Sequence, residues 1–189
     1  MLQLSNVKYI VSAAKLDTQP DVMEHIKRIN PFLFQVRNPL ARAWIVGEIH
    51  PLGEWTLKDY SKRPFDSHAS ALGPEEIAAR HKIPYYQAVD KIEYNNVNSI
   101  RMEVTTAQRG VVVLSEASYP GWRVTVNGKP SNIIRLNYLF QGVEVDSGRQ
   151  QIQFEYQPPF FRLYLLISFF TFLFIILSWF FCHSLKRKI

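Results

Sequence analysis

The sequence predicts a mainly β protein with minor α-helix: an antiparallel β-sandwich outside the cytoplasm, then one C-terminal transmembrane helix. Three observations predict this class. No charge interrupts the twenty residues from Leu163 to Cys182, and apolar and polar residues alternate with period two from Val89 onward, as in half-buried strands. Turn signals such as Asn127-Gly128 separate these short segments. With 47% hydrophobic and 20% charged residues, the chain is too apolar for a disordered protein.

Residues 1–88 are expected to form a mixed α/β N-terminal part of the outer domain. Val22, Ile26 and Ile29 recur at helical spacing, which predicts a helix over Pro20–Ile29. Pro74 followed by two glutamates predicts a second short helix, which ends before Pro84. The other segments expected in this part are a strand over 7–11, two strands over 32–36 and 43–49 joined by a turn, and a loop over 50–73.

Residues 89–157 are expected to form the antiparallel sandwich itself. Val111 to Leu114 is continuously apolar, which predicts a central strand. Trp122, Val124 and Val126 alternate with polar residues up to Asn-Gly, the strongest short hairpin signal, because both residues tolerate positive φ. Six or seven short strands at this spacing are typical of a sandwich.

Residues 163–182 are long enough to cross a bilayer, since twenty residues at ~1.5 Å each span ~30 Å of helix. A buried core helix is the alternative, but it usually keeps a polar stripe. The tail over 183–189 holds Lys186, Arg187 and Lys188 and no acid, which predicts a cytoplasmic tail and an outer sandwich. Pro158-Pro159 in a stalk over 158–162 would hold the sandwich close to the lipid surface.

Composition also excludes several classes of function. The net charge is +6, but three of the 22 basic residues lie in the tail, so 19 bases face 16 acids elsewhere and nucleic-acid binding is not expected. Motifs for a metal, a nucleophile, a phosphate or a dinucleotide are absent, and we expect no catalytic residue, metal or cofactor. The histidines are interpreted as scattered surface residues: His25, His50, His68, His81 and His183. The single cysteine, Cys182, can form no disulfide within the outer domain.

One segment, Leu114 to Trp122, has two interpretations. In the structural interpretation, Pro-Gly makes a turn, Trp122 fills the core and Tyr119 covers an edge. In the functional one, the two rings beside Glu116 and Arg123 form a shelf that stacks on a sugar. We expect the structural interpretation, because a single aromatic pair within a strand pattern is more often core.

The run LSEASYPGWRVTVNGKP, followed by the FQGV segment, the turn at Gly148, FEYQPP and an apolar helix, resembles the C-terminal part of the bacterial YfhO membrane-protein family. The segments NVKYIV near the start and Asn38 to Val46 also resemble it. The resemblance implies a relation to C-type membrane glycosyltransferases. These take sugar from a polyprenyl-phosphate donor and glycosylate envelope polymers such as teichoic acids, with catalytic acids in an outward loop after the first membrane helix.

Because no membrane helix precedes residue 163, the resemblance transfers no catalytic residue, and the chain is expected to be the tail of a longer protein or a split one. Two functions remain open. The chain is either the non-catalytic outer domain and last membrane helix of a glycosyltransferase-like protein, or a self-contained membrane-anchored binding module. Its expected partners are the lipid bilayer, the catalytic membrane part of the same system, and an envelope glycan or polyprenyl-linked sugar.

Overall fold

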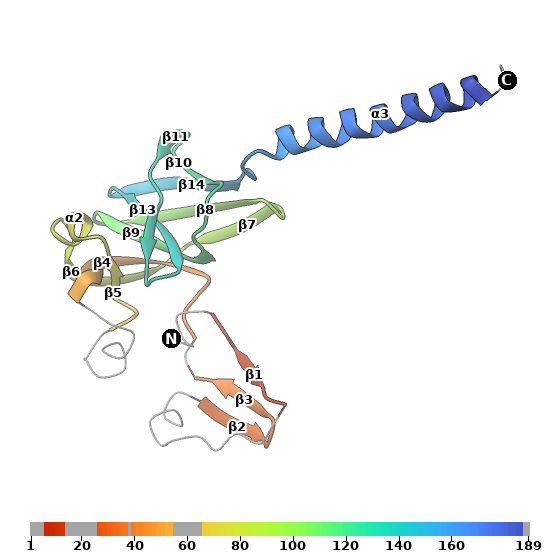
Figure 1. Cartoon of the computed structure of the whole chain (residues 1–189). Coiled ribbons are helices and arrows are strands. Elements are labelled where there is room, and N and C mark those ends of the chain that lie inside the picture. Colours follow the sequence, from red (N-terminus) through yellow and green to blue (C-terminus); the bar gives the residue numbers. More distant parts are fainter. Residues whose placement is uncertain (1–5, 14–25, 38, 55–65, 187–189) are drawn as a thin grey trace. The chain divides into compact units, whose positions relative to one another are not determined.

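The computed structural model describes residues 6–13, 26–37, 39–54 and 66–186, with side chains through 179 (Figure 1). The chain divides into two compact units, Met1–Tyr156 and Gln157–Ile189. The first unit holds every strand of the described residues, and the second holds the long helix α3. The predicted class, mainly β with one apolar C-terminal helix, is confirmed.

A five-stranded antiparallel sheet forms one layer of the sandwich, in the order β11-β10-β14-β8-β7. All of its strands come from the segment after Val89. Period-two alternation predicted four of them, and β11, after the Asn127-Gly128 turn, was not predicted. Figure 1 shows β8 and β14 running side by side through its middle. The strands are β7 (Lys91–Asn96), β8 (Ser99–Thr106), β10 (Trp122–Val126), β11 (Lys129–Ser131) and β14 (Gly148–Tyr156).

A six-stranded sheet forms the other layer, with β12-β13-β9-β4-β5 in order and β6 paired to β4. It joins strands from both sides of residue 88, because β4 pairs with β9. One pair, β4 with β5, is parallel, whereas we predicted an antiparallel sandwich. The strands are β4 (Ala43–Pro51), β5 (Ser70–Gly73), β6 (Lys82–Ala88), β9 (Gly110–Ala117), β12 (Ile134–Leu136) and β13 (Phe140–Val145).

The strand β9 is buried on both faces, which explains its unbroken apolar sequence. Val112 and Leu114 point into the core between the sheets, together with Met102 and Phe154 of the opposite layer. Val111 and Val113 face a second core, which is closed by Trp44, Leu136 and the short helix α2 (Glu75–Ala78). The prediction of a central strand over Val111–Leu114 is therefore confirmed.

The Asn127-Gly128 turn joins β10 to β11 as a two-residue hairpin, as predicted. Val126 pairs with Lys129, and the turn residues have φ of 52° and 76°. Both values fall in the left-handed region that a type I′ turn needs, and asparagine and glycine adopt it at low cost.

A small three-stranded sheet, β1-β3-β2, precedes the sandwich in the sequence and has its own apolar cluster. Its strands are β1 (Tyr9–Val11), β2 (Ile26–Asn30) and β3 (Leu33–Val36). The predicted helix over Pro20–Ile29 is wrong where the structure describes it, since Ile26 to Ile29 lie in β2; residues 20–25 lie outside the described residues. In a strand, positions three apart face opposite sides, so Ile26 is buried while Ile29 is exposed.

Two further strands were missed in the region before Val89. β5 lies within the predicted loop over 50–73, which also contains the 3₁₀ turn η1 (Leu52–Glu54), and β6 includes Pro84. The ladder between β6 and β4 shifts its register between Val46 and Glu48, opposite the segment that holds Pro84. Proline is tolerated where a strand needs no donor at that position. The predicted helix after Pro74 is present as α2, but it ends at Ala78.

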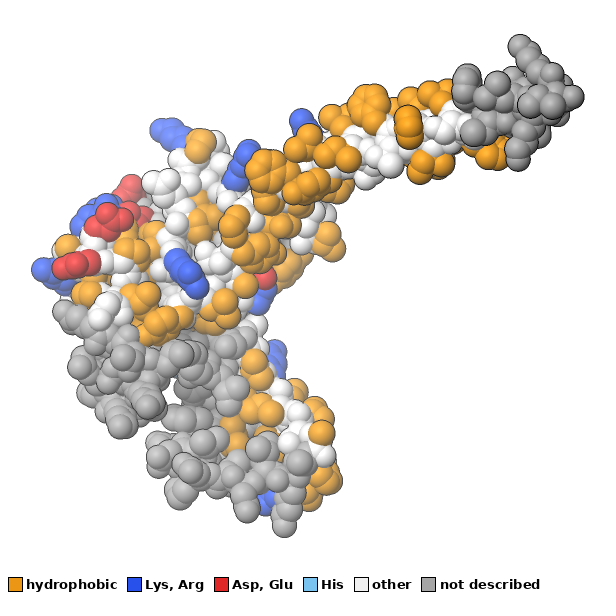
Figure 2. All heavy atoms as spheres, viewed as in Figure 1, with side chains coloured by type: hydrophobic (Ala, Val, Ile, Leu, Met, Phe, Trp, Pro, Cys, Tyr) orange, Lys and Arg blue, Asp and Glu red, His pale blue; other side chains and the backbone are white. Residues whose placement is uncertain are grey.

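The helix α3 spans Phe161–Lys186, and within it Phe161–Trp179 has a mean hydropathy of 2.1. Among the described residues this is the one helix long and apolar enough to cross a membrane. Ser168 Oγ donates to Tyr164 O at 2.9 Å and Thr171 Oγ1 to Ile167 O at 2.8 Å, so both hydroxyls are satisfied inside the helix. Figure 2 shows hydrophobic side chains along the visible face of α3.

Candidate functional site

The sandwich has two ends of different chemistry. The end at which the chain leaves the sandwich toward α3 is called the exit end. There β14 ends at Tyr156, and β10 begins at Trp122, the cross-strand partner of Tyr156. At the far end lie the Asn127-Gly128 turn, the turn that enters β14 at Gly148, and a cluster of ion pairs around Glu144.

Three aromatic rings pack together at the exit end. The ring centroids of Trp122 and Tyr156 lie 5.4 Å apart, and Tyr119 meets Tyr156 edge-on at 5.1 Å and Trp122 at 6.2 Å. Trp122 is half-buried against the core between the sheets, and its Nε1 atom is buried without a hydrogen-bond partner in the described structure. Tyr119 remains 44% exposed. These rings therefore cover the open end of the core, and Tyr119 presents its outer side to the surroundings.

The two charged residues predicted to flank the rings lie in different settings. Glu116, near the end of β9, forms an ion pair with Arg42 Nη2, while Arg42 Nη1 donates to Ser115 O. Arg123 follows Trp122 in β10, so its side chain leaves the opposite face of the strand, which is exposed. The structure thus brings together Tyr119 and Trp122, whereas Glu116 is engaged by Arg42 and Arg123 points away from the Trp122 face.

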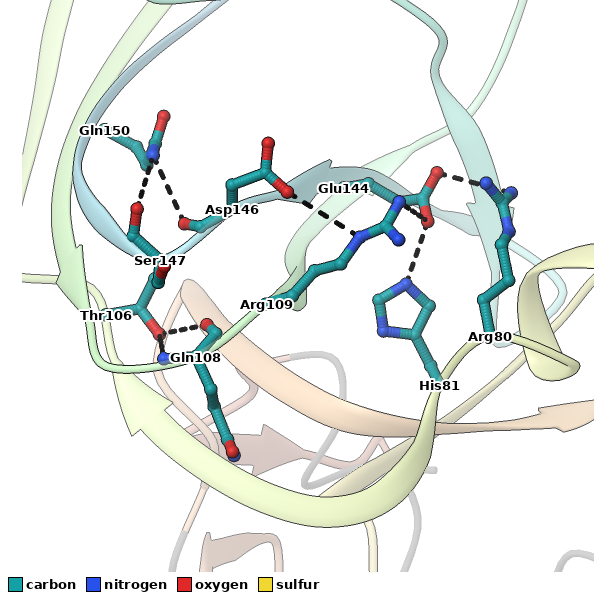
Figure 3. Close-up of polar contacts among 9 residues, drawn as sticks. All are labelled: Arg80, His81, Thr106, Gln108, Arg109, Glu144, Asp146, Ser147 and Gln150. Atoms are coloured by element: carbon teal, nitrogen blue, oxygen red, sulfur yellow. Dashed lines mark hydrogen bonds and ion pairs between the residues drawn. The ribbon is translucent and has the colours of Figure 1, made fainter.

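At the far end, Glu144 of β13 accepts contacts from three side chains (Figure 3). Its Oε1 atom lies 2.9 Å from His81 Nε2 and 3.1 Å from Arg109 Nη2, and its Oε2 atom lies 3.3 Å from Arg80 Nη2. Arg109 Nε also lies 3.8 Å from the exposed carboxylate of Asp146. Glu144 is 23% exposed, so these contacts are only partly screened by water. The cluster ties β13 to the turn after α2 and to the chain entering β9.

His81 is 3% exposed, so the interpretation of the histidines as scattered surface residues is wrong for it. It also lines a cavity of about 410 Å³, together with Glu48 and His50. Glu48 there accepts from Ser70 Oγ at 2.7 Å and lies 3.3 Å from His50 Nε2. Sequence reasoning missed Glu144 and His81 because they are 63 positions apart, and only the folded sheet brings them together.

The polar groups of this far end are arranged for mutual neutralisation. Glu48 in the cavity and Glu144 in the cluster each accept from a neighbouring side chain, whereas a general base must face its substrate. Among the described residues, no group of three or more His, Cys, Asp or Glu side chains could hold a metal ion. Shifted pKa values occur at the exposed β7 pair: the hydrogen bond between Lys91 and Glu93 raises the pKa of the lysine and lowers that of the glutamate.

Comparison with known proteins assigns most of the sandwich and the start of α3 to one family region. The family model described as "Bacterial membrane protein YfhO" matches residues 77–168. This match supports membership of the YfhO family. It is 27% identical over 82 residues to the Bacillus subtilis (strain 168) protein named "Uncharacterized protein YfhO". That match covers 43% of this chain and 9% of the relative, so the chain spans only a small part of its length. No solved structure matches the chain.

The YfhO region begins within α2 and continues through β14 into α3. It includes the three exit-end rings and the Glu144 cluster with its three partners. It leaves out β1 to β5, although β4 pairs with β9 at the centre of the sandwich.

Proposed function

We propose that the chain is a non-catalytic outer domain with its membrane helix, and that it assists a YfhO-family protein in glycosylating cell-envelope polymers. The observation that carries the proposal is the single YfhO match over residues 77–168, which runs from the sandwich into the apolar helix. Because one family region includes most of the sandwich and the start of the apolar helix, it supports a role for the domain beside the membrane. The catalytic membrane part of the same system and an envelope glycan or polyprenyl-linked sugar are the proposed partners.

The engaged state of the acidic side chains supports a non-catalytic role. Glu144 has three partners, Glu116 has Arg42 and Glu48 has Ser70. A glycosyl transfer needs an acid or base whose oxygen can reach the substrate, and these oxygens are already held by neighbouring side chains.

The experiment compares membranes of the bacterium that encodes this chain with membranes from a strain in which its gene is deleted. Both receive a radiolabelled polyprenyl-phosphate sugar, and incorporation into envelope polymer is measured. We expect deletion to lower incorporation and re-expression of the full chain to restore it, while the purified chain alone transfers no sugar above a no-protein control. Unchanged incorporation after deletion, or turnover by the purified chain, would contradict the proposal.

The proposed orientation places the sandwich outside the cytoplasm and the tail inside. It is supported by the sequence, in which Lys186, Arg187 and Lys188 follow the apolar span without an acid. A reporter enzyme that is active only outside the cytoplasm, fused after Ile189, should be silent. Activity of that fusion would reverse the orientation.

A second candidate function is a self-contained anchored module that binds a glycan through Glu116, Tyr119, Trp122 and Arg123. The exposed outer side of Tyr119 favours it. Titration of envelope glycan onto the full chain should then give binding that Tyr119→Ala weakens. Binding that is unaffected by this substitution would locate the ligand elsewhere.

A further inference from the structure

The exit end presents apolar side chains that the sandwich core does not use. Val97, in the turn between β7 and β8, is 97% exposed, and Leu139, just before β13, is 52% exposed. With the outer side of Tyr119, they form the exit patch, defined here as Val97, Tyr119 and Leu139. A fully exposed valine adds nothing to core packing, so the need to close the core does not explain this patch.

Main-chain contacts place the exit patch at one end of the sandwich. Tyr156 N donates to Asn98 O at 2.8 Å, which brings the turn that holds Val97 to the end of β14. Ser118 N donates to Leu139 O at 2.7 Å, which brings Leu139 beside the residue before Tyr119. The patch therefore surrounds the point at which β14 ends.

The chain itself keeps this end near the beginning of the apolar span. Tyr156 ends β14 and Phe161 begins α3, five residues later. At ~3.3–3.6 Å per residue, the two positions lie at most about 18 Å apart in any arrangement of the two units. The headgroup layer on each side of a bilayer is roughly 5–8 Å thick, so a side chain at the exit end can reach it.

The residue types of the exit end suit that layer. Tyrosine and tryptophan gather at membrane interfaces because their rings combine an apolar body with a polar tip. Of the two acids in this region, Glu116 is neutralised by Arg42, and the exposed Glu155 lies directly across the β10–β14 ladder from Arg123. The far end instead carries Arg80, Arg109 and the acids of the Glu144 cluster, which belong in water.

We propose that the exit patch rests in the headgroup layer of the bilayer and makes the sandwich a lipid-contacting domain. This inference shares one premise with the proposed function, that α3 spans the membrane. It depends neither on which side the sandwich lies nor on glycosylation.

The test uses the full chain with Cys182→Ser and one introduced cysteine that carries a polarity-sensitive fluorophore. Val97→Cys reports the exit patch. Ile83→Cys is the matched control, because Ile83 is an exposed apolar residue, 68% exposed, in β6 toward the far end. Leu173→Cys reports whether α3 is inserted. Each protein is reconstituted in phosphatidylcholine–phosphatidylglycerol vesicles, with and without a lipid that carries a nitroxide near the headgroup.

We expect blue-shifted emission at position 97 and at least about twofold stronger quenching there than at position 83, because only the exit end lies in the lipid interface. Adding Leu139→Asp should reduce the quenching at position 97. If the probes at 97 and 83 both emit as in water, while the probe at 173 emits as in an apolar environment, the lipid contact alone would be overturned. A water-like probe at 173 would overturn it together with membrane insertion. The probe at 97 is also measured in native membranes. A blue shift of its emission there, without a shift in the lipid vesicles, would assign the patch to a protein and overturn the proposal.

Discussion

The two ends of the sandwich are held together by different physical means. At the exit end, three rings cover the gap between the sheets, and the contribution comes from burial of apolar area, which is non-directional and little affected by salt. At the far end, Glu144 gathers His81, Arg80 and Arg109, and the contribution depends on charge and geometry. The difference shows that one sandwich can present an apolar end and a charged end without changing its core.

The largest loss of stability is expected from a substitution at the exit end. Trp122→Ala removes a large half-buried ring from the edge of the core and should lower the free energy of unfolding by ~3 kcal/mol. Thermal unfolding of the full chain in detergent, followed by near-ultraviolet circular dichroism, measures it. Tyr119→Ala, at a more exposed ring, should cost only about 1 kcal/mol. A Trp122→Ala protein that melts with the wild type would show that this ring is a ligand platform and not core.

The next largest loss of stability is expected from a substitution at the far end. Glu144→Gln removes the charge that His81, Arg80 and Arg109 share and should cost about 2 kcal/mol, a reduced value because the side chain is partly exposed. The same unfolding measurement applies. Asp146→Asn is the matched control. The exposed carboxylate of Asp146 lies 3.8 Å from Arg109 Nε, so the free energy of unfolding should change by no more than ~0.5 kcal/mol. An equal loss of unfolding free energy in the two variants would show that Glu144 does not hold the cluster together.

A smaller effect concerns the hairpin at the far end. Gly128 has φ of +76°, so Gly128→Ala should cost ~1 kcal/mol even though a Cβ there meets no atom within 4 Å. Gly53→Ala also meets open space without the positive φ and should be nearly neutral. Similar melting temperatures for both variants would show that the turn relaxes.

The smallest effect separates the two ends by salt. In 1 M NaCl the Debye length falls to ~3 Å, so the cost of Glu144→Gln should shrink by a few tenths of a kcal/mol while that of Trp122→Ala stays the same. Melting curves of both variants in low and high salt measure this. A Trp122→Ala penalty that falls equally would indicate that charge also governs the exit end.

Local rules predicted the parts of the fold that depend on near neighbours. The run Val111–Leu114, the Asn127-Gly128 turn and the uncharged helix each have a signal within a few residues, and the structure contains all three. The helix over Pro20–Ile29 failed because Ile26 and Ile29 fit helical spacing, while pairing with β3 decides in favour of a strand.

Contacts between distant residues explain what the sequence did not predict. Strand β6 contains a proline and is held by β4, about forty residues earlier. The Glu144 cluster joins residues from three segments, none of which has a motif. The site residues Glu116, Tyr119, Trp122 and Arg123 remain a prediction for ligand binding, and the structure adds that only the two rings share a face.

The pairing of β4 with β9 also has a consequence for how the protein folds. Ala43 pairs with Leu114, so β4 leaves the ribosome about seventy residues before its central partner. At roughly 5–20 residues per second, this apolar strand waits several seconds for the strand that covers it. Such distant pairing slows folding and leaves an unpaired strand exposed meanwhile. Strand β6 pairs with β4 before β9 is made, so the hydrogen-bonding edge that stays open to aggregation is the one that β9 covers.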